Sequence, residues 1–113
     1  MSALSDYLLG IANIKFLYIM GEGSGNLVDS KGAHTATAAG SPSGYGSTAL
    51  VVGDATTSIL FDGTDDDFRA DDHADFAMGT NDMWLHVLIK TSTNAVMYVF
   101  NQGDHDSGWD LNF

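Results

Sequence analysis

Hydrophobic and polar residues alternate along two stretches in the second half of the chain. In residues 82–90 one face is uniformly apolar and consists of Met83, Leu85, Val87 and Ile89. The opposite face carries Trp84, His86, Leu88 and Lys90. In residues 108–113, Trp109, Leu111 and Phe113 share one face. Because successive side chains of a strand point to opposite faces, we expect a long strand over 82–90 with its apolar face in the core, and a last strand over 108–113.

Other runs of strand-forming residues are separated by turn signals. Residues 14–20 are almost continuously apolar, which is typical of a strand covered on both faces. Residues 57–61 lead into the turn dipeptide Asp62-Gly63, after which the chain is extended to Phe68, so a hairpin is expected there. Further strands are expected over 33–38, 49–52 and 95–100, and a surface loop over 39–47. Strands at about ten-residue intervals indicate an all-β antiparallel sandwich or barrel.

The first residues differ from this pattern. Ser5 and Asp6 could cap a short helix over residues 7–12, with Leu8, Leu9 and Ile11 on its apolar side. We therefore divide the chain into an N-terminal arm, residues 1–13, and a β domain, residues 14–113. The arm is interpreted either as a docking segment or as a turn of helix lying on the domain.

The charge excludes several classes of partner. The formal net charge is -11 at pH 7, and only four residues are Lys or Arg. Nucleic-acid binding needs clustered positive charge, so neither a nucleic acid nor an anionic membrane surface is an expected partner. Residues 1–6 carry no Lys or Arg, and the apolar run 8–20 is interrupted and short, so we expect no signal peptide, no membrane insertion and synthesis in a cytoplasm.

Several blocks occur in an order that resembles a known family. They are the loop Gly21-Glu22-Gly23-Ser24-Gly25, the turn Asp29-Ser30-Lys31-Gly32, the block Phe61-Asp62-Gly63-Thr64-Asp65-Asp66, and Gly108-Trp109-Asp110-Leu111. Together they resemble the N-terminal half of the concanavalin A-like jelly-roll domains of the laminin G-like family. The resemblance implies a jelly-roll sandwich of two packed antiparallel sheets, a structural calcium ion, and recognition of carbohydrate or protein.

Calcium ligands and a sugar-binding ring can be assigned to particular residues. Calcium is bound by hard carboxylate and carbonyl oxygens, and Asp29, Asp62 and Asp65 lie in or beside turns where backbone carbonyls are free to help. Sugars pack against exposed aromatic rings, for which Tyr45 and Trp84 are the candidates. Tyr45 is the ring expected to be more exposed, whereas the alternation around Trp109 predicts core packing.

Catalysis is not expected. Family members that cleave glucans carry paired glutamates on one strand, whereas Glu22 is the only glutamate of this chain. The histidines show no H-x-x-x-H spacing, and no serine stands in a G-x-S-x-G context. His73, in an acidic loop, is interpreted as a solvated surface histidine. The chain therefore lacks the signals of an acid-base, zinc-dependent or serine-dependent enzyme.

The leading hypothesis is a non-enzymatic recognition or adhesion module that binds carbohydrate or another surface. The final apolar strand would leave an unpaired edge, so we expect the sandwich to be incomplete or completed by other protein subunits. The N-terminal arm and the absence of cysteine fit a phage virion component, located on the virion or at a cell surface after assembly. The alternative is a purely structural virion protein, a capsid decoration or tail subunit, that binds no sugar. A third reading is a bacterial surface or secreted module seen without its full chain.

Overall fold

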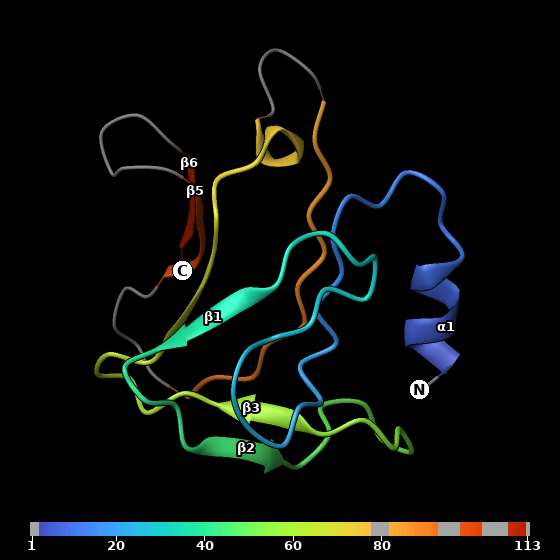
Figure 1. Cartoon of the computed structure of the whole chain (residues 1–113). Coiled ribbons are helices and arrows are strands. Elements are labelled where there is room, and N and C mark those ends of the chain that lie inside the picture. The colour runs from blue at the N-terminus through green and yellow to red at the C-terminus, as the bar shows by residue number, and fades with distance from the viewer. Residues whose placement is uncertain (1–2, 78–81, 93–97, 103–108, 113) are drawn as a thin grey trace. The chain divides into compact units, whose positions relative to one another are not determined.

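The computed structural model describes residues 3–77, 82–92, 98–102 and 109–112 (Figure 1). Of residues 98, 102 and 109–112 it describes the backbone alone. The chain divides into two compact units, Met1–Asp75 and Phe76–Phe113, which are treated one at a time. In chain order the elements are α1 (Ala3–Leu9), β1 (Ala36–Ala39), β2 (Gly44–Ser47), β3 (Ser58–Leu60), β4 (Asp67–Ala70), the 3-10 helix η1 (Ala74–Phe76), β5 (Tyr98–Gln102) and β6 (Trp109–Asn112).

The strands of the described residues form three antiparallel pairs. Strand β1 pairs with β4, β2 with β3, and β5 with β6. In the described part of the chain, helix is limited to α1 and the single turn η1. No helix within these residues has both the length and the apolar character needed to cross a membrane. The expected all-β, antiparallel class is therefore confirmed at this level.

A small core joins the four strands of the first unit. Its buried members are Leu27, Ala36 and Ile59, which are 4%, 3% and 9% exposed. Leu27 and Ala36 exchange two backbone hydrogen bonds, so the segment before β1 is held against that strand. Tyr45 on β2 and Phe68 on β4 pack against this cluster and are half-buried. Both sheets of the unit thus contribute side chains to one core, as short strands require for stability.

The Asp62-Gly63 turn is confirmed, but the hairpin expected around it is wrong. Gly63 adopts φ +79°, the left-handed conformation that glycine tolerates best. The strands on either side do not pair with each other, because β3 pairs with β2 and β4 pairs with β1. The intervening loop is closed by its own side chains. Asp62 Oδ1 accepts the N–H of Thr64 at 2.7 Å, and Asp66 Oδ2 accepts the N–H of Asp62 at 3.0 Å.

Three expected strands are not formed as expected. Residues 14–20 make only the single bridge Tyr18↔Asp29, and residues 49–52 form a bend in which Val52 is fully exposed. Residues 82–90 are not a strand, and on their expected core face Met83, Val87 and Ile89 are each about 40% exposed. An extended segment becomes a strand only by hydrogen bonding to a neighbour. Within the described residues, 82–90 has no such neighbour.

Two other strands correct or support the expectation from sequence. Strand β2 lies inside the predicted surface loop, because Gly44–Ser47 gains its order from pairing with β3 and carries little strand propensity of its own. Strand β6 agrees with the predicted last strand, and it pairs with β5 from Gln102↔Trp109 to Tyr98↔Asn112. Residues 95–97, 108 and 113 of the predicted strands lie outside the described residues.

The N-terminal helix is shifted from its predicted position. It spans Ala3–Leu9 instead of residues 7–12, and Ser5 is a buried helix residue rather than a cap. The Lys31 ammonium lies 3.3 Å from the carbonyl oxygen of Leu9 and 3.4 Å from that of Ile11. A lysine near a helix C-terminus satisfies carbonyls that lack partners within the helix. This contact attaches α1 to the turn around Lys31.

Candidate functional site

The carboxylate of Asp29 stabilises a turn of the first unit through hydrogen bonds to the backbone. Asp29 is 3% exposed, and its two oxygens accept hydrogen bonds from four backbone N–H groups. Oδ1 binds Leu17 and Lys31, both at 2.9 Å, and Oδ2 binds Ala33 at 3.3 Å and His34 at 3.1 Å. N–H donors thus surround the carboxylate that sequence analysis assigned to calcium. The structure does not bring Asp29 together with the other predicted metal ligands.

This turn also shifts the pKa values of two side chains, Asp29 and Tyr18. Burial alone would raise the pKa of Asp29, but the hydrogen bonds from four backbone N–H groups stabilise the charged form and hold the pKa below its usual value. The Tyr18 hydroxyl donates a hydrogen bond to the carbonyl oxygen of His34. Burial, together with the negative charge of Asp29, raises the pKa of Tyr18 to about 12.

The other two predicted calcium ligands do come together. Asp62, Asp65 and Asp66 each offer a carboxylate oxygen, and these oxygens lie within 4.8 Å of one another in the loop between β3 and β4. Asp62 and Asp65 are exposed and Asp66 is half-buried. Such a cluster offers the hard oxygen ligands that calcium prefers.

The two predicted sugar-binding rings differ in exposure. Tyr45 is half-buried, its hydroxyl donates to the carbonyl oxygen of Gly25 at 2.5 Å, and its ring lies edge-on to Phe68. The expectation that Tyr45 is the exposed ring is therefore wrong, because the ring is part of the core. Trp84 is 67% exposed and stacks on His86, with ring centroids 5.6 Å apart. The side chain of Trp109, expected in the core, lies outside the described part of the structure.

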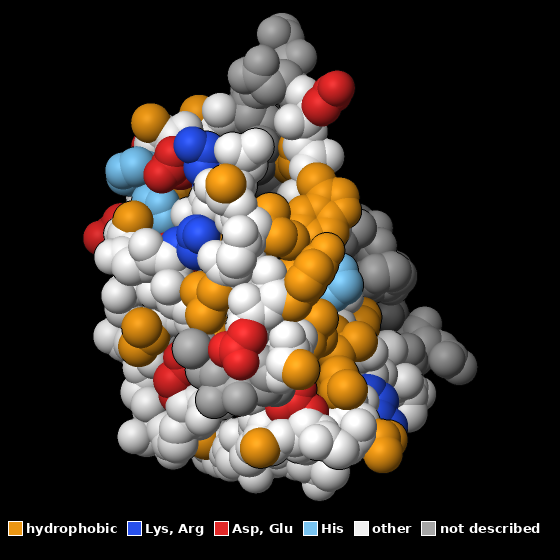
Figure 2. Space-filling model, turned by 90° about the vertical axis from the view of Figure 1, so that its right-hand side faces the viewer, with side chains coloured by type: hydrophobic (Ala, Val, Ile, Leu, Met, Phe, Trp, Pro, Cys, Tyr) orange, Lys and Arg blue, Asp and Glu red, His pale blue; other side chains and the backbone are white. Residues whose placement is uncertain are grey.

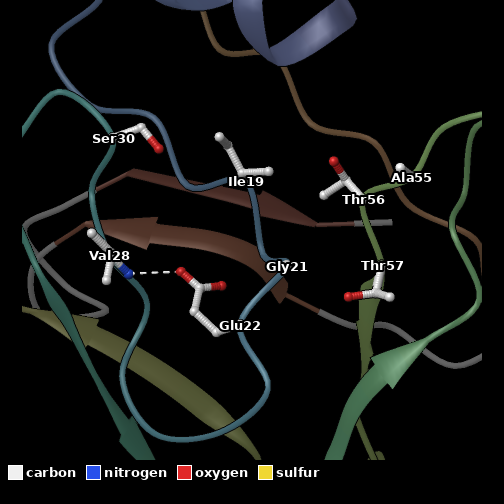
Figure 3. Close-up of a pocket in the computed structure, with 8 residues that line it drawn as sticks. All are labelled: Ile19, Gly21, Glu22, Val28, Ser30, Ala55, Thr56 and Thr57. Carbon is white, nitrogen blue, oxygen red and sulfur yellow. Dashed lines mark hydrogen bonds between the residues drawn. The ribbon is translucent and has the colours of Figure 1, made fainter. Parts of the chain in front are cut away.

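A shallow groove in the first unit contains the only glutamate. Eight residues line about 440 Å³, namely Ile19, Gly21, Glu22, Val28, Ser30, Ala55, Thr56 and Thr57 (Figure 3). Glu22 Oε1 accepts the backbone N–H of Val28 at 2.9 Å. Glu22 Oε2 is buried and makes no hydrogen bond to the residues that the structure describes. The hydroxyls of Ser30, Thr56 and Thr57 and this carboxylate give the groove a polar lining that sequence analysis did not identify.

A second group of side chains also escaped sequence analysis. His34, which is buried, lies with its Nε2 3.0 Å from Asp75 Oδ2, and His73 Nδ1 lies 3.3 Å from the same oxygen. Lys15 Nζ lies 3.3 Å from Asp75 Oδ1. The hydrogen bond from His34, aided by Lys15 and His73, lowers the pKa of Asp75. The H-x-D spacing of residues 73–75 was a signal in the sequence, but nothing there linked it to His34.

Comparisons of the chain with protein-family models, with curated proteins and with solved structures find no match.

Proposed function

We propose that the chain is a non-enzymatic recognition module that binds carbohydrate through the exposed ring of Trp84. The observation that carries this proposal is the exposure of two-thirds of that side chain. A tryptophan is large and is on average well buried in folded proteins, so a ring left in water is unusual and points to a binding role. The apolar face of a sugar ring packs on such an indole.

The surroundings of the indole support this use. Trp84 and His86 lie on the same side of an extended segment, and their rings are stacked with an interplanar angle of 28°. Stacking restricts the rotamers of Trp84 before a ligand arrives. A ring that is already ordered loses less conformational entropy on binding. His86 and Lys90 are exposed in the same segment and could donate hydrogen bonds to sugar hydroxyls.

A jelly-roll sandwich of the concanavalin A-like type is our proposal for the finer fold. It is supported by antiparallel pairing throughout the described strands and by the contribution of β1, β2, β3 and β4 to one core. It is also supported by the pairing of β3 and β4 with other strands, since a chain that crosses between sheets is usual in Greek-key sandwiches.

A second candidate function is contact with another protein subunit, as in a virion. The observation that favours it is that residues 83–89 expose apolar side chains on both faces, namely Met83, Trp84, Val87, Leu88 and Ile89. Hydrophobic side chains are exposed among polar ones in the view of Figure 2. Apolar surface of this kind is frequent at protein interfaces. A structural subunit would bury this segment against a neighbour and bind no sugar.

A glycan-binding screen on the full chain distinguishes these two functions. We expect at least one glycan to bind, and Trp84→Ala to lower its affinity about 30-fold, which corresponds to the about 2 kcal/mol typical of an aromatic hot spot. Glu22→Gln is the matched control, because Glu22 lies in the other unit.

Three outcomes would count against the proposal. The absence of binding to any glycan, with calcium present, favours the structural subunit. Equal binding by the wild-type chain and the Trp84→Ala variant removes the indole from the site. Loss of binding in Glu22→Gln instead moves the sugar site to the groove of Figure 3.

A structural calcium ion at Asp62, Asp65 and Asp66 is part of the proposal. A ligand that binds only the folded state stabilises it by about 2.7 kcal/mol at 100 times its dissociation constant. We therefore expect a calcium chelator to lower the melting temperature by more than about 5 °C, and added calcium to restore it. Asp65→Asn should abolish this response, and Asp71→Asn, an exposed acid outside the cluster, should keep it. An unchanged melting temperature in the chelator would mean that no calcium ion stabilises the fold.

A further inference from the structure

We propose that His34, His73 and Asp75 form a binding site for a divalent transition-metal ion, and that zinc is the ion that they fit best. Each residue offers one ligand atom, and these atoms lie within 4.8 Å of one another. All three residues belong to the first unit. Two imidazoles and one carboxylate form a ligand set common to catalytic and regulatory metal sites.

The distances agree with the dimensions of a zinc site. Zinc lies about 2.0–2.1 Å from nitrogen and carboxylate ligands, so two ligands at a tetrahedral angle are about 3.3 Å apart. Asp75 Oδ2 lies 3.0 Å from His34 Nε2 and 3.3 Å from His73 Nδ1. Two of the three distances between ligand atoms are therefore already close to those expected around a bound zinc ion. The third distance, between the two histidine nitrogens, is at most 4.8 Å and shortens when an ion binds, and the half-exposed side chain of His73 is the one with room to move.

His34 is the fixed member of the set. Its side chain is 2% exposed. Its backbone N–H donates a hydrogen bond to Asp29 Oδ2, and its backbone carbonyl oxygen accepts a hydrogen bond from the hydroxyl of Tyr18. A ligand held by such partners does not have to be ordered when the ion binds, which favours affinity. The Asp29 turn therefore supports the proposed site without contributing a ligand to it.

The orientation of His73 also fits an ion. Its Nδ1 lies 3.0 Å from the backbone N of Asp75 and 3.3 Å from Asp75 Oδ2. Because Nδ1 accepts the N–H of Asp75, this nitrogen is unprotonated, and its single lone pair must turn from that N–H to the ion when one binds. A cation between Nδ1 and Oδ2 would attract both atoms more strongly than the neutral backbone N–H attracts Nδ1. A neutral imidazole nitrogen is also the form in which histidine binds metals.

One neighbour opposes a cation. Lys15 Nζ lies 3.3 Å from Asp75 Oδ1, but this side chain is 64% exposed, so water screens most of its charge. It binds Oδ1 and leaves Oδ2 to face both histidines. The ligand set also differs from the carboxylate cluster at Asp62, which offers oxygen atoms only and suits calcium. The two clusters are expected to select different metals.

The test is titration of the untagged full chain with ZnCl2, followed by calorimetry and by melting temperature. We expect one zinc ion to bind, with Mg²⁺ giving no response, and Co²⁺ to give the absorption typical of a tetrahedral site with nitrogen ligands. His73→Ala should weaken zinc binding by more than about 100-fold, because even loss of an outer partner costs about 10–100-fold. His73 is half exposed, so this variant is expected to fold.

Matched controls separate the site from general surface binding. His86→Ala removes an exposed histidine of the other unit, and Asp72→Asn removes an exposed carboxylate beside His73. Both should bind zinc as the wild-type chain does, whereas Asp75→Asn should not. The proposal is overturned if the wild-type chain does not bind zinc, or if His73→Ala binds it unchanged. Neither result depends on whether a glycan is bound.

Discussion

Replacement of Asp29 by alanine is expected to lower the free energy of unfolding of the first unit by about 3–5 kcal/mol. The change removes the acceptor of four backbone N–H groups, two on each carboxylate oxygen. Of the four donors only the N–H of His34 is fully buried, where the loss of its partner costs about 1–3 kcal/mol, whereas water can partly replace the partner of the other three. A small domain is stable by only about 5–15 kcal/mol, so the loss of this one carboxylate removes a large fraction of the stability.

Two further variants test the cause of that loss. Asp29→Asn keeps one oxygen and places an NH2 group against the N–H donors of the other, so about half of the loss is expected. Asp71→Ala removes an exposed acid and should change stability by less than about 0.5 kcal/mol. Urea unfolding followed by circular dichroism measures all three. If Asp29→Ala unfolds at the same urea concentration as Asp71→Ala, the hydrogen bonds do not stabilise the unit.

The same carboxylate gives stability a definite dependence on pH. The pKa of Asp29 is lower in the folded chain than the usual 3.8. The unfolded chain therefore takes up the proton first as the pH falls, so the stability from Asp29 is fully present above the unfolded pKa and is lost as the pH drops through the folded pKa. Asp75, whose pKa is also lowered, acts in the same direction. Asp29→Asn should make the loss of stability below about pH 4 less steep, without removing it.

Gly40→Ala is expected to have the second large effect, a loss of about 3 kcal/mol or more. Gly40 directly follows β1 and has φ +72°, a conformation that costs an L-residue about 1–2 kcal/mol. A Cβ at this position would also lie 2.0 Å from the carbonyl oxygen of Asp65 and 2.4 Å from its carbonyl carbon. Because both are backbone atoms of the loop before β4, that loop would have to move away from the end of β1.

Gly63→Ala is the matched control for this clash. Gly63 has φ +79°, but a Cβ there would meet nothing within 4 Å. It should therefore show the conformational cost alone, about 1–2 kcal/mol. Thermal melting of both variants measures the difference. Equal melting temperatures for the two variants would mean that the contact between Gly40 and Asp65 is not tight.

Local chemistry explains which parts of the fold could be predicted. The Asp62-Gly63 turn and the strand before it follow from residues adjacent in sequence, and so does the presence of a strand within residues 108–113. The pairing of β1 with β4 is a long-range contact that no local signal specifies. For residues 82–90 the alternation predicts a core face but cannot supply a neighbouring strand, and Met83, Val87 and Ile89 on that face are each about 40% exposed.

The same distinction applies to the sites. Asp62 and Asp65 are three residues apart in one turn, so sequence placed them together. Asp29 was a reasonable calcium ligand by residue type, but its oxygens face N–H groups that only the folded turn brings near. His34 and Asp75 are 41 positions apart, and only tertiary structure makes them neighbours.

The hydroxyl of Tyr18 gives this turn a role at high pH. In the unfolded chain Tyr18 ionises near its usual pKa of 10.0, whereas in the folded chain its pKa is about 12. Above pH 10 the unfolded chain releases a proton that the folded chain retains. The stability that Tyr18 contributes through its hydrogen bond to the carbonyl of His34 is therefore lost as the pH rises. The N–H of the same residue is bound by Asp29. The backbone of His34 thus joins the group that makes the unit sensitive to acid to the group that makes it sensitive to alkali. Since Tyr18 is one of four tyrosines, the tyrosinate absorbance that is missing from Tyr18→Phe reports on that junction.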